Sequence, residues 1–266
     1  MGHHNHHFGG DQHSLRGAWS PPNSRANFCE EDYTMSFYLA EFINSVSNLA
    51  YVYFALKAIY QRREADFMSL SLLALGVGSF LFHATLRHTM EFCDELSMLL
   101  LTWSMLHAVL TVRQTKHRSR IISFALAVVF LSFSAFYVWS ATIIYQVIAF
   151  SCALGMVTAR GQYLLNWMPD SERWFGTERS NEWNARTRQA IGVCIFGYVL
   201  WHIDLEFCME LRALRGMMGL PWAWGLELHG WWHVLTAIGA AKFMDVAREI
   251  REEEKEERAK AGKKRE

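Results

Sequence analysis

The sequence has no excess of charge of either sign, with 26 lysines and arginines against 26 aspartates and glutamates. This balance gives no reason to expect a nucleic-acid partner. Its five cysteines show no CxxC spacing, and the first residues do not resemble a cleavable signal peptide. The length of 266 residues suits one sizeable domain,. Charged residues are unevenly distributed, and their near absence from long stretches of the chain is the most informative feature of the composition.

These apolar stretches predict membrane-spanning helices. A helix needs about 20 mostly apolar residues to cross the hydrocarbon core of a bilayer. Many such stretches would be implausible in one small soluble domain, so we predict an all-α integral membrane protein with a bundle of seven transmembrane helices. The predicted spans are Phe37–Tyr60, Phe67–Leu86, Asp94–Val112, Ile121–Trp139, Ala141–Val157, Gln189–Phe207 and Leu228–Val246.

The charged segments set the predicted domain boundaries. Residues 1–26 form a histidine-rich N-terminal segment that we expect to be flexible and non-catalytic. Residues 27–247 form the membrane domain. Residues 248–266 alternate glutamate with lysine and arginine, which indicates a solvated tail that either extends the last helix or is disordered. The histidines of the first segment are His3, His4, His6, His7 and His13.

The connections between the spans alternate in basic charge. The first, third and fifth are rich in lysine and arginine, whereas the second has one arginine, the fourth has none and the sixth has two. Since basic connections favour the cytosolic face, we predict a lumenal or extracellular N-terminus and a cytosolic C-terminus. Cys29 and Cys208 then share the lumenal side, where a disulfide between them is possible.

Ionisable side chains in spans are costly and suggest function by default. His229 and His233 are four residues apart, so they share one helix face, and this spacing lets two imidazoles reach one metal. The predicted orientation brings His83, near the end of the second span, and Asp94, at the start of the third, to the same lumenal depth. Three histidines with one open position are the arrangement of catalytic zinc.

This cluster predicts a hydrolytic site. The metal would lower the pKa of its bound water and supply a hydroxide nucleophile. Asp94 would orient that water or shuttle its proton. Ser79, one turn before His83, would hydrogen-bond the developing oxyanion. The alternative is that these polar residues only bridge helices.

A second polar group ends the sixth span, again on the predicted lumenal side. We interpret it as structural, with support or gating of the metal site as the alternative. It consists of His202, Asp204 and Glu206.

An acidic cluster precedes the first span, and Glu41 lies within that predicted span. Oxygen ligands this close together suit calcium. The cluster is not an EF-hand loop, because the glycine and the spacing are absent. Acidic residues before a helix also act as caps, which is the alternative. Glu41 favours a cation, because a carboxylate within a span needs a partner.

Several separated blocks of sequence share their order and spacing with one known family. They are FCEEDY at 28–33, YLAEFINSVSN at 38–48, GSFLFHATL at 78–86, DELSM at 94–98, WHID at 201–204 and HGWWH at 229–233. From about Gly17 to Val246, the chain resembles the alkaline ceramidases, which are seven-span hydrolases of the endoplasmic reticulum and Golgi.

The resemblance implies a role for each candidate residue. Zinc would be held, with water as the fourth ligand, by His83, His229 and His233. The catalytic partners would be Ser79 and Asp94. Calcium would be held by the side chains of Asn27, Glu30, Asp32 and Glu41 and the carbonyl of Phe28. The family usually has Asp-Trp where this chain has Asn27-Phe28, so the site loses one negative charge and we expect weaker calcium affinity.

The resemblance also implies a reaction. Zinc-activated water would hydrolyse the N-acyl amide bond of ceramide from the bilayer to a sphingoid base and a free fatty acid, with stimulation by calcium. No obligate protein partner is indicated. One alternative is a zinc hydrolase or receptor of the same seven-span superfamily, which includes the progestin-and-adiponectin receptors, acting on another lipid. A metal transporter would need polar residues on both sides of the midplane, and a scaffold would leave the one-sided cluster unexplained.

Overall fold

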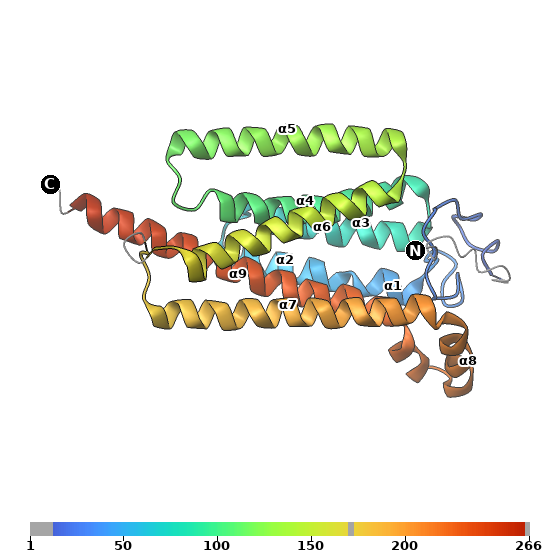
Figure 1. Ribbon diagram of the computed structural model, residues 1–266. Coiled ribbons are helices and arrows are strands. Elements are labelled where there is room, and N and C mark those ends of the chain that lie inside the picture. Colours follow the sequence, from blue (N-terminus) through green and yellow to red (C-terminus); the bar gives the residue numbers. More distant parts are fainter. Residues whose placement is uncertain (1–12, 170–172, 264–266) are drawn as a thin grey trace. The chain divides into compact units, whose positions relative to one another are not determined.

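The computed structural model of the protein describes residues 13–169 and 173–263 (Figure 1). All regular secondary structure in these residues is helical, which confirms the predicted all-α class. The histidines His3, His4, His6 and His7 of the predicted N-terminal segment lie outside the described residues. The elements are α1 (Phe42–Ser47), α2 (Leu49–Arg62), α3 (Phe67–Thr85), α4 (His88–Leu110), α5 (Lys116–Ser140), α6 (Ile143–Gln162), η1 (Tyr163–Trp167), α7 (Thr177–Glu206), α8 (Cys208–Met218), η2 (Trp222–Leu226) and α9 (Leu228–Lys263).

Four helices are long and apolar enough to cross a membrane. They are α3, α4, α5 and α6 with its continuation η1. A fifth span is possible if α7 and α8, which meet at 90°, are counted together. Several apolar helices fit an integral membrane protein, but the predicted count of seven spans is not confirmed.

If α7 and α8 together are counted as the sixth predicted span, the difference in count arises at the first and last predicted spans. The first is broken at Asn48 into the 6-residue α1 and the 14-residue α2, and neither is long enough to cross alone,. The last coincides with the start of α9, where His229, His233 and Lys242 interrupt the apolar sequence. The polar residues that carry the candidate chemistry thus weaken the hydropathy signal of their own helices.

The chain forms two compact units. One comprises Met1–Ser97 with Ile191–Gly239, and the other comprises Met98–Ala190 with Ala240–Glu266. The long helices α4, α7 and α9 each contribute to both units. All three histidines of the predicted zinc site belong to the first unit.

Close helix approaches within the first unit are marked by two glycines. A Cβ atom on Gly78 of α3 would lie 3.1 Å from the carbonyl oxygen of Cys93 in α4. One on Gly230 of α9 would lie 3.0 Å from Cγ2 of Ile43 in α1. Larger residues at these points would push apart the helices that carry the predicted site.

A disulfide joins Cys29 to Cys208, with 5.3 Å between their Cα atoms. This confirms the pairing that the sequence left as a possibility. The link connects the loop before α1 to the first residue of α8. Arg215 of α8 adds a second contact to the same loop, because its guanidinium donates to the carbonyl oxygen of Cys29 at 2.9 Å and also pairs with Glu227.

Charged contacts to α9 hold together one end of the second unit. Arg186 and Trp183 of α7 both donate to the Glu249 carboxylate, at 2.7 and 2.8 Å. The backbone N–H of Arg113 donates to Glu254 at 2.9 Å. The charged C-terminal sequence therefore continues α9 as one helix through Lys263 and packs against its own unit.

Candidate metal centre

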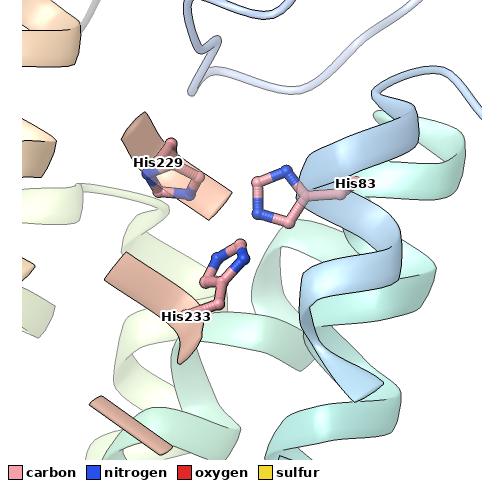
Figure 2. Close-up of side chains that lie close together, drawn as sticks. All are labelled: His83, His229 and His233. Atoms are coloured by element: carbon pink, nitrogen blue, oxygen red, sulfur yellow. The ribbon is translucent and has the colours of Figure 1, made fainter. Parts of the chain in front are cut away.

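Three buried imidazoles meet in the first unit, as Figure 2 shows. His83 comes from the last turns of α3, and His229 and His233 come from the first turns of α9. Each ring offers one nitrogen, and these three nitrogens lie within 4.8 Å of one another. The ring centroids are 4.5 to 5.1 Å apart. The two histidines four residues apart share one face of α9 and turn toward the third, as their spacing predicts.

The nitrogens of these rings suit a metal ion. His83 Nδ1 lies 2.5 Å from Glu41 Oε2, and His233 Nδ1 lies 2.8 Å from Ser47 Oγ. In metal sites the ring nitrogen that does not bind the ion is usually held in this way. Nε2 of His83 and Nδ1 of His229 are buried and have no hydrogen-bond partner. Buried nitrogens without partners are costly, and a bound ion would satisfy them.

Glu41 is a predicted calcium ligand and also contacts a histidine of the predicted zinc site. The sequence placed it within the first span as a calcium ligand, but the structure places it at the residue before α1. Its Oε2 contacts His83 and accepts a hydrogen bond from Asn44 Nδ2 at 3.1 Å. Its Oε1 is buried and has no partner. The backbone N–H of Glu41 also donates to the carbonyl oxygen of His83 at 3.0 Å, so backbone and side chain both fix this contact.

Ser79 and Asp94 contact each other. The Ser79 hydroxyl donates a hydrogen bond to the Asp94 carboxylate, and both side chains are buried. Ser79 lies one turn before His83 on α3. The structure starts α4 at His88, so Asp94 lies in its second turn and does not open the helix. The close approach at Gly78 brings the two helices near enough for this hydrogen bond.

The predicted calcium ligands lie in the loop before α1. Phe28 stacks on His229 with 3.9 Å between the ring centroids, and Asn27 Oδ1 accepts from the Phe28 N–H at 2.8 Å. The Glu30 carboxylate accepts from the N–H groups of Ile43 at 2.7 Å and Asn44 at 2.8 Å. The side chains Glu30, Asp32 and Glu41 are all buried.

Burial and electrostatic repulsion both disfavour the charged form of Glu30 in this acidic group. Burial, then the charges of Glu227 and Glu41, raises the pKa of Glu30 well above its usual value. The three histidines are nevertheless the only group of at least three His, Cys, Asp or Glu side chains, within the described part of the chain, whose ligand atoms gather within 4.8 Å. The acidic residues therefore lie around one loop without converging as tightly as the imidazoles.

The structure adds two residues that support the histidines. Ser47, which contacts His233, lies in the block 38–48 that carries the family resemblance, but nothing in that block singled it out as a site residue. Asp204 accepts hydrogen bonds from the N–H groups of Leu228 at 3.2 Å and Cys29 at 3.4 Å. It thereby connects the start of α9 to the loop before α1. The other two members of the second polar group, His202 and Glu206, are exposed and do not join the cluster.

Comparison with known proteins gives one consistent result. Residues 20–264 match the family described as Ceramidase. The chain is 28% identical over 232 residues to alkaline ceramidase 3 of Mus musculus, covering 85% of this chain and 83% of that protein. It is also 28% identical over 247 residues to an alkaline ceramidase of Saccharomyces cerevisiae, covering 85% and 76%. An alkaline ceramidase of Arabidopsis thaliana is 26% identical over 230 residues, covering 84% and 82%.

Proposed function

Because the chain belongs to the alkaline ceramidase family, we propose that it hydrolyses the amide bond of ceramide to a sphingoid base and a free fatty acid. The observation that carries this proposal is the group of three buried histidines on α3 and α9. Ser79 shares helix α3 with His83, and its hydrogen-bond partner Asp94, on α4, would supply the group for proton transfer.

Zinc is the metal that this donor set suits best. Three neutral imidazoles with no carboxylate among the ligands are a known zinc arrangement that keeps one position open. A bound zinc ion would polarise the amide carbonyl and supply a nucleophilic water. Glu41 and Ser47 would hold the Nδ1 atoms of His83 and His233, so that the Nε2 atoms of both rings face the ion,.

Asp94 would move the proton of the reaction. Its carboxylate would accept a proton as the nucleophile attacks and deliver that proton to the amide nitrogen, which leaves as an amine. Ser79 donates to this carboxylate and would fix its orientation. When substrate is present, the hydroxyl would turn its single proton from Asp94 to the carbonyl oxygen of the amide as negative charge develops there.

Calcium would bind close to the histidine cluster. Glu41 Oε1 has no hydrogen-bond partner, and burial, followed by repulsion from Glu227 and Glu41, raises the pKa of Glu30. A divalent cation held by Asn27, Phe28, Glu30, Asp32 and Glu41 would offset this repulsion. Since the other oxygen of Glu41 contacts His83, such a cation would also stabilise the position of a zinc ligand.

The disulfide supports the proposed orientation and compartment. Disulfides persist in the lumen of the endoplasmic reticulum and outside the cell, and they are rare in the cytosol. Cys29 and Cys208 would therefore lie on the lumenal side, with a cytosolic C-terminus, in the endoplasmic reticulum or Golgi. Ceramide would enter from the bilayer and present its amide at the depth of the lipid headgroups.

The test combines activity with metal content. Purified protein is expected to release sphingoid base from ceramide at alkaline pH, and His233→Ala is expected to lose both zinc and activity. His202→Ala is the matched control, because His202 is exposed and lies outside the cluster. Full zinc occupancy in a folded His233→Ala protein would show that the metal site is wrong.

A further inference from the structure

A cavity of about 340 Å³ lies at one end of three helices in the second unit. Its volume falls within the range of small-ligand sites, about 300 to 1,000 Å³. The walls come from the end of α4, the turn that follows it, the first turns of α5 and the last turn of α6. The lining residues are Leu110, Gln114, Arg118, Ile121, Ile122 and Arg160.

The polar wall of the cavity is cationic. Arg118 and Arg160 both line it, and no carboxylate is among its lining residues. Arg160 is held in place, because its Nε donates to the carbonyl oxygen of Val109 at 3.4 Å and its guanidinium lies 4.9 Å above the ring of Tyr163. The Arg118 side chain is exposed. Neither arginine takes part in an ion pair within residues 13–169 and 173–263.

The nearby acids of α9 are already paired with other groups. Glu254 accepts from the backbone N–H of Arg113 at 2.9 Å and pairs with Arg258 at 2.6 Å. Glu257 pairs with Arg113 at 3.2 Å. These acids therefore leave the two lining arginines to bind an anion from outside the chain.

The other wall of the cavity is aliphatic, formed by Leu110, Ile121 and Ile122. All three helices around the cavity are apolar enough to cross a membrane. The α5 sequence changes from charged to apolar between Arg120 and Ile121. The cavity therefore lies where the lipid headgroups meet the hydrocarbon, and a bound molecule would contact both cationic and aliphatic side chains.

We propose that this cavity binds an anionic phospholipid from the leaflet that these helix ends face, which is the cytosolic leaflet in the proposed orientation. The phosphate lies between Arg118 and Arg160, since guanidinium groups match phosphate oxygens in geometry and charge. The glycerol and upper acyl chain pack on Ile121 and Ile122. Basic pockets between helices at the cytosolic side of membrane proteins bind lipid headgroups in this way. The site is separate from the histidine cluster and does not depend on ceramide hydrolysis.

The test is native mass spectrometry of the full-length protein in detergent, titrated with dioleoylphosphatidylglycerol or dioleoylphosphatidylcholine. The anionic lipid is expected to bind more tightly. Arg118→Ala/Arg160→Ala is expected to weaken its binding by about 25-fold, or about fivefold for each charge removed. Lys116→Ala/Arg120→Ala removes the same charge from the same end of α5 without touching the cavity wall, and we expect a smaller loss than in the lining variant, because salt screens exposed charges away from the bound phosphate.

Three outcomes would overturn the proposal. Equal losses in the two double variants would indicate diffuse attraction to a basic surface. No loss in Arg118→Ala/Arg160→Ala would exclude the cavity. Competition by inorganic phosphate that removes all binding, with no effect of Ile122→Ser, would identify a free anion as the ligand. If the double variant does not fold, Arg118→Ala alone decides, because its exposed side chain lacks an ion pair in the described chain, and about a fivefold loss is expected,.

Discussion

Glu41 Oε2 lies 2.5 Å from Nδ1 of His83, and both side chains are completely buried. The contact joins the residue before α1 to the last turns of α3. An ionised Glu41 would select the Nδ1-protonated form of the imidazole and leave Nε2, which is buried without a hydrogen-bond partner, for a metal ion,. The remaining oxygen of Glu41 has no partner. One carboxylate is therefore placed to stabilise a proposed zinc ligand and to take part in the proposed calcium site.

Glu41→Gln is expected to weaken zinc binding by about 10- to 100-fold, because the amide keeps the shape of the side chain but loses its charge. Competition with a zinc-selective chelator measures this change. The same variant is expected to lose the response of activity to calcium. Glu31→Gln, an exposed neighbour in the same acidic segment, is the control and is expected to behave like the wild type. A folded Glu41→Gln protein with normal zinc affinity would contradict the role given to this contact.

Asp94→Asn is expected to lower kcat by about 10²- to 10⁴-fold while zinc content stays normal, because it removes the proton carrier without removing a metal ligand. Metal analysis and turnover of ceramide in the same sample separate the two effects. Ser79→Ala leaves Asp94 without its hydrogen bond, and we expect a smaller loss of kcat. Loss of zinc together with activity in Asp94→Asn would assign this residue to metal binding.

The sequence predicted the three histidines correctly as a spatial group. The spacing of His229 and His233 follows from helix geometry, and the alternation of loop charge placed His83 at the same depth. The contact between Glu41 and His83 could not be predicted, because the predicted span began at Phe37, whereas α1 begins at Phe42 and leaves Glu41 before the helix. The break between α1 and α2 at Asn48 was not predicted either. No pattern in the apolar sequence marks this break, and a continuous span was the simpler expectation.

Asp204 shows a second limit of sequence patterns. Its carboxylate bonds to backbone N–H groups of Cys29 and Leu228, which are distant in the sequence. Backbone N–H groups are present at every residue except proline, so the sequence cannot reveal which of them an acid will meet. The number of membrane spans is hard to predict for a related reason. The polar site residues reduce the hydropathy of α9, the helix that carries them.

Cys208→Ser is expected to lower the free energy of unfolding by about 2 to 5 kcal/mol, because the disulfide closes a long loop of the chain. Thermal unfolding in detergent measures this loss as a lower Tm. Cys152→Ser is the matched control, since Cys152 is a free thiol. An unchanged Tm, or two additional free thiols in the protein isolated under non-reducing conditions, would argue against both the disulfide and the lumenal placement that rests on it.

Glu249→Gln is expected to destabilise the second unit by about 1 kcal/mol at neutral pH. Partial burial raises the pKa of Glu249, but hydrogen bonds from Arg186 and Trp183 outweigh this effect and hold the pKa below its usual value. A lowered pKa in the folded state means that the stabilisation is present above the unfolded pKa of about 4.3 and is lost as the pH falls through the folded value.

The measurement for this variant is Tm against pH. The difference between wild type and Glu249→Gln should be full near neutral pH and should shrink below a pH of about 4. Glu256→Gln, an exposed residue of the same helix, is the control. A difference in Tm that grows in acid would contradict the assigned direction of the pKa shift.

The most direct test of the account is removal and return of the metal. A chelator that strips zinc from the purified protein is expected to abolish ceramide hydrolysis, and added zinc is expected to restore it. His229→Ala should regain neither zinc nor activity under the same conditions. Undiminished ceramide hydrolysis by protein that metal analysis shows to be free of zinc would contradict the central claim that the three histidines hold the catalytic ion.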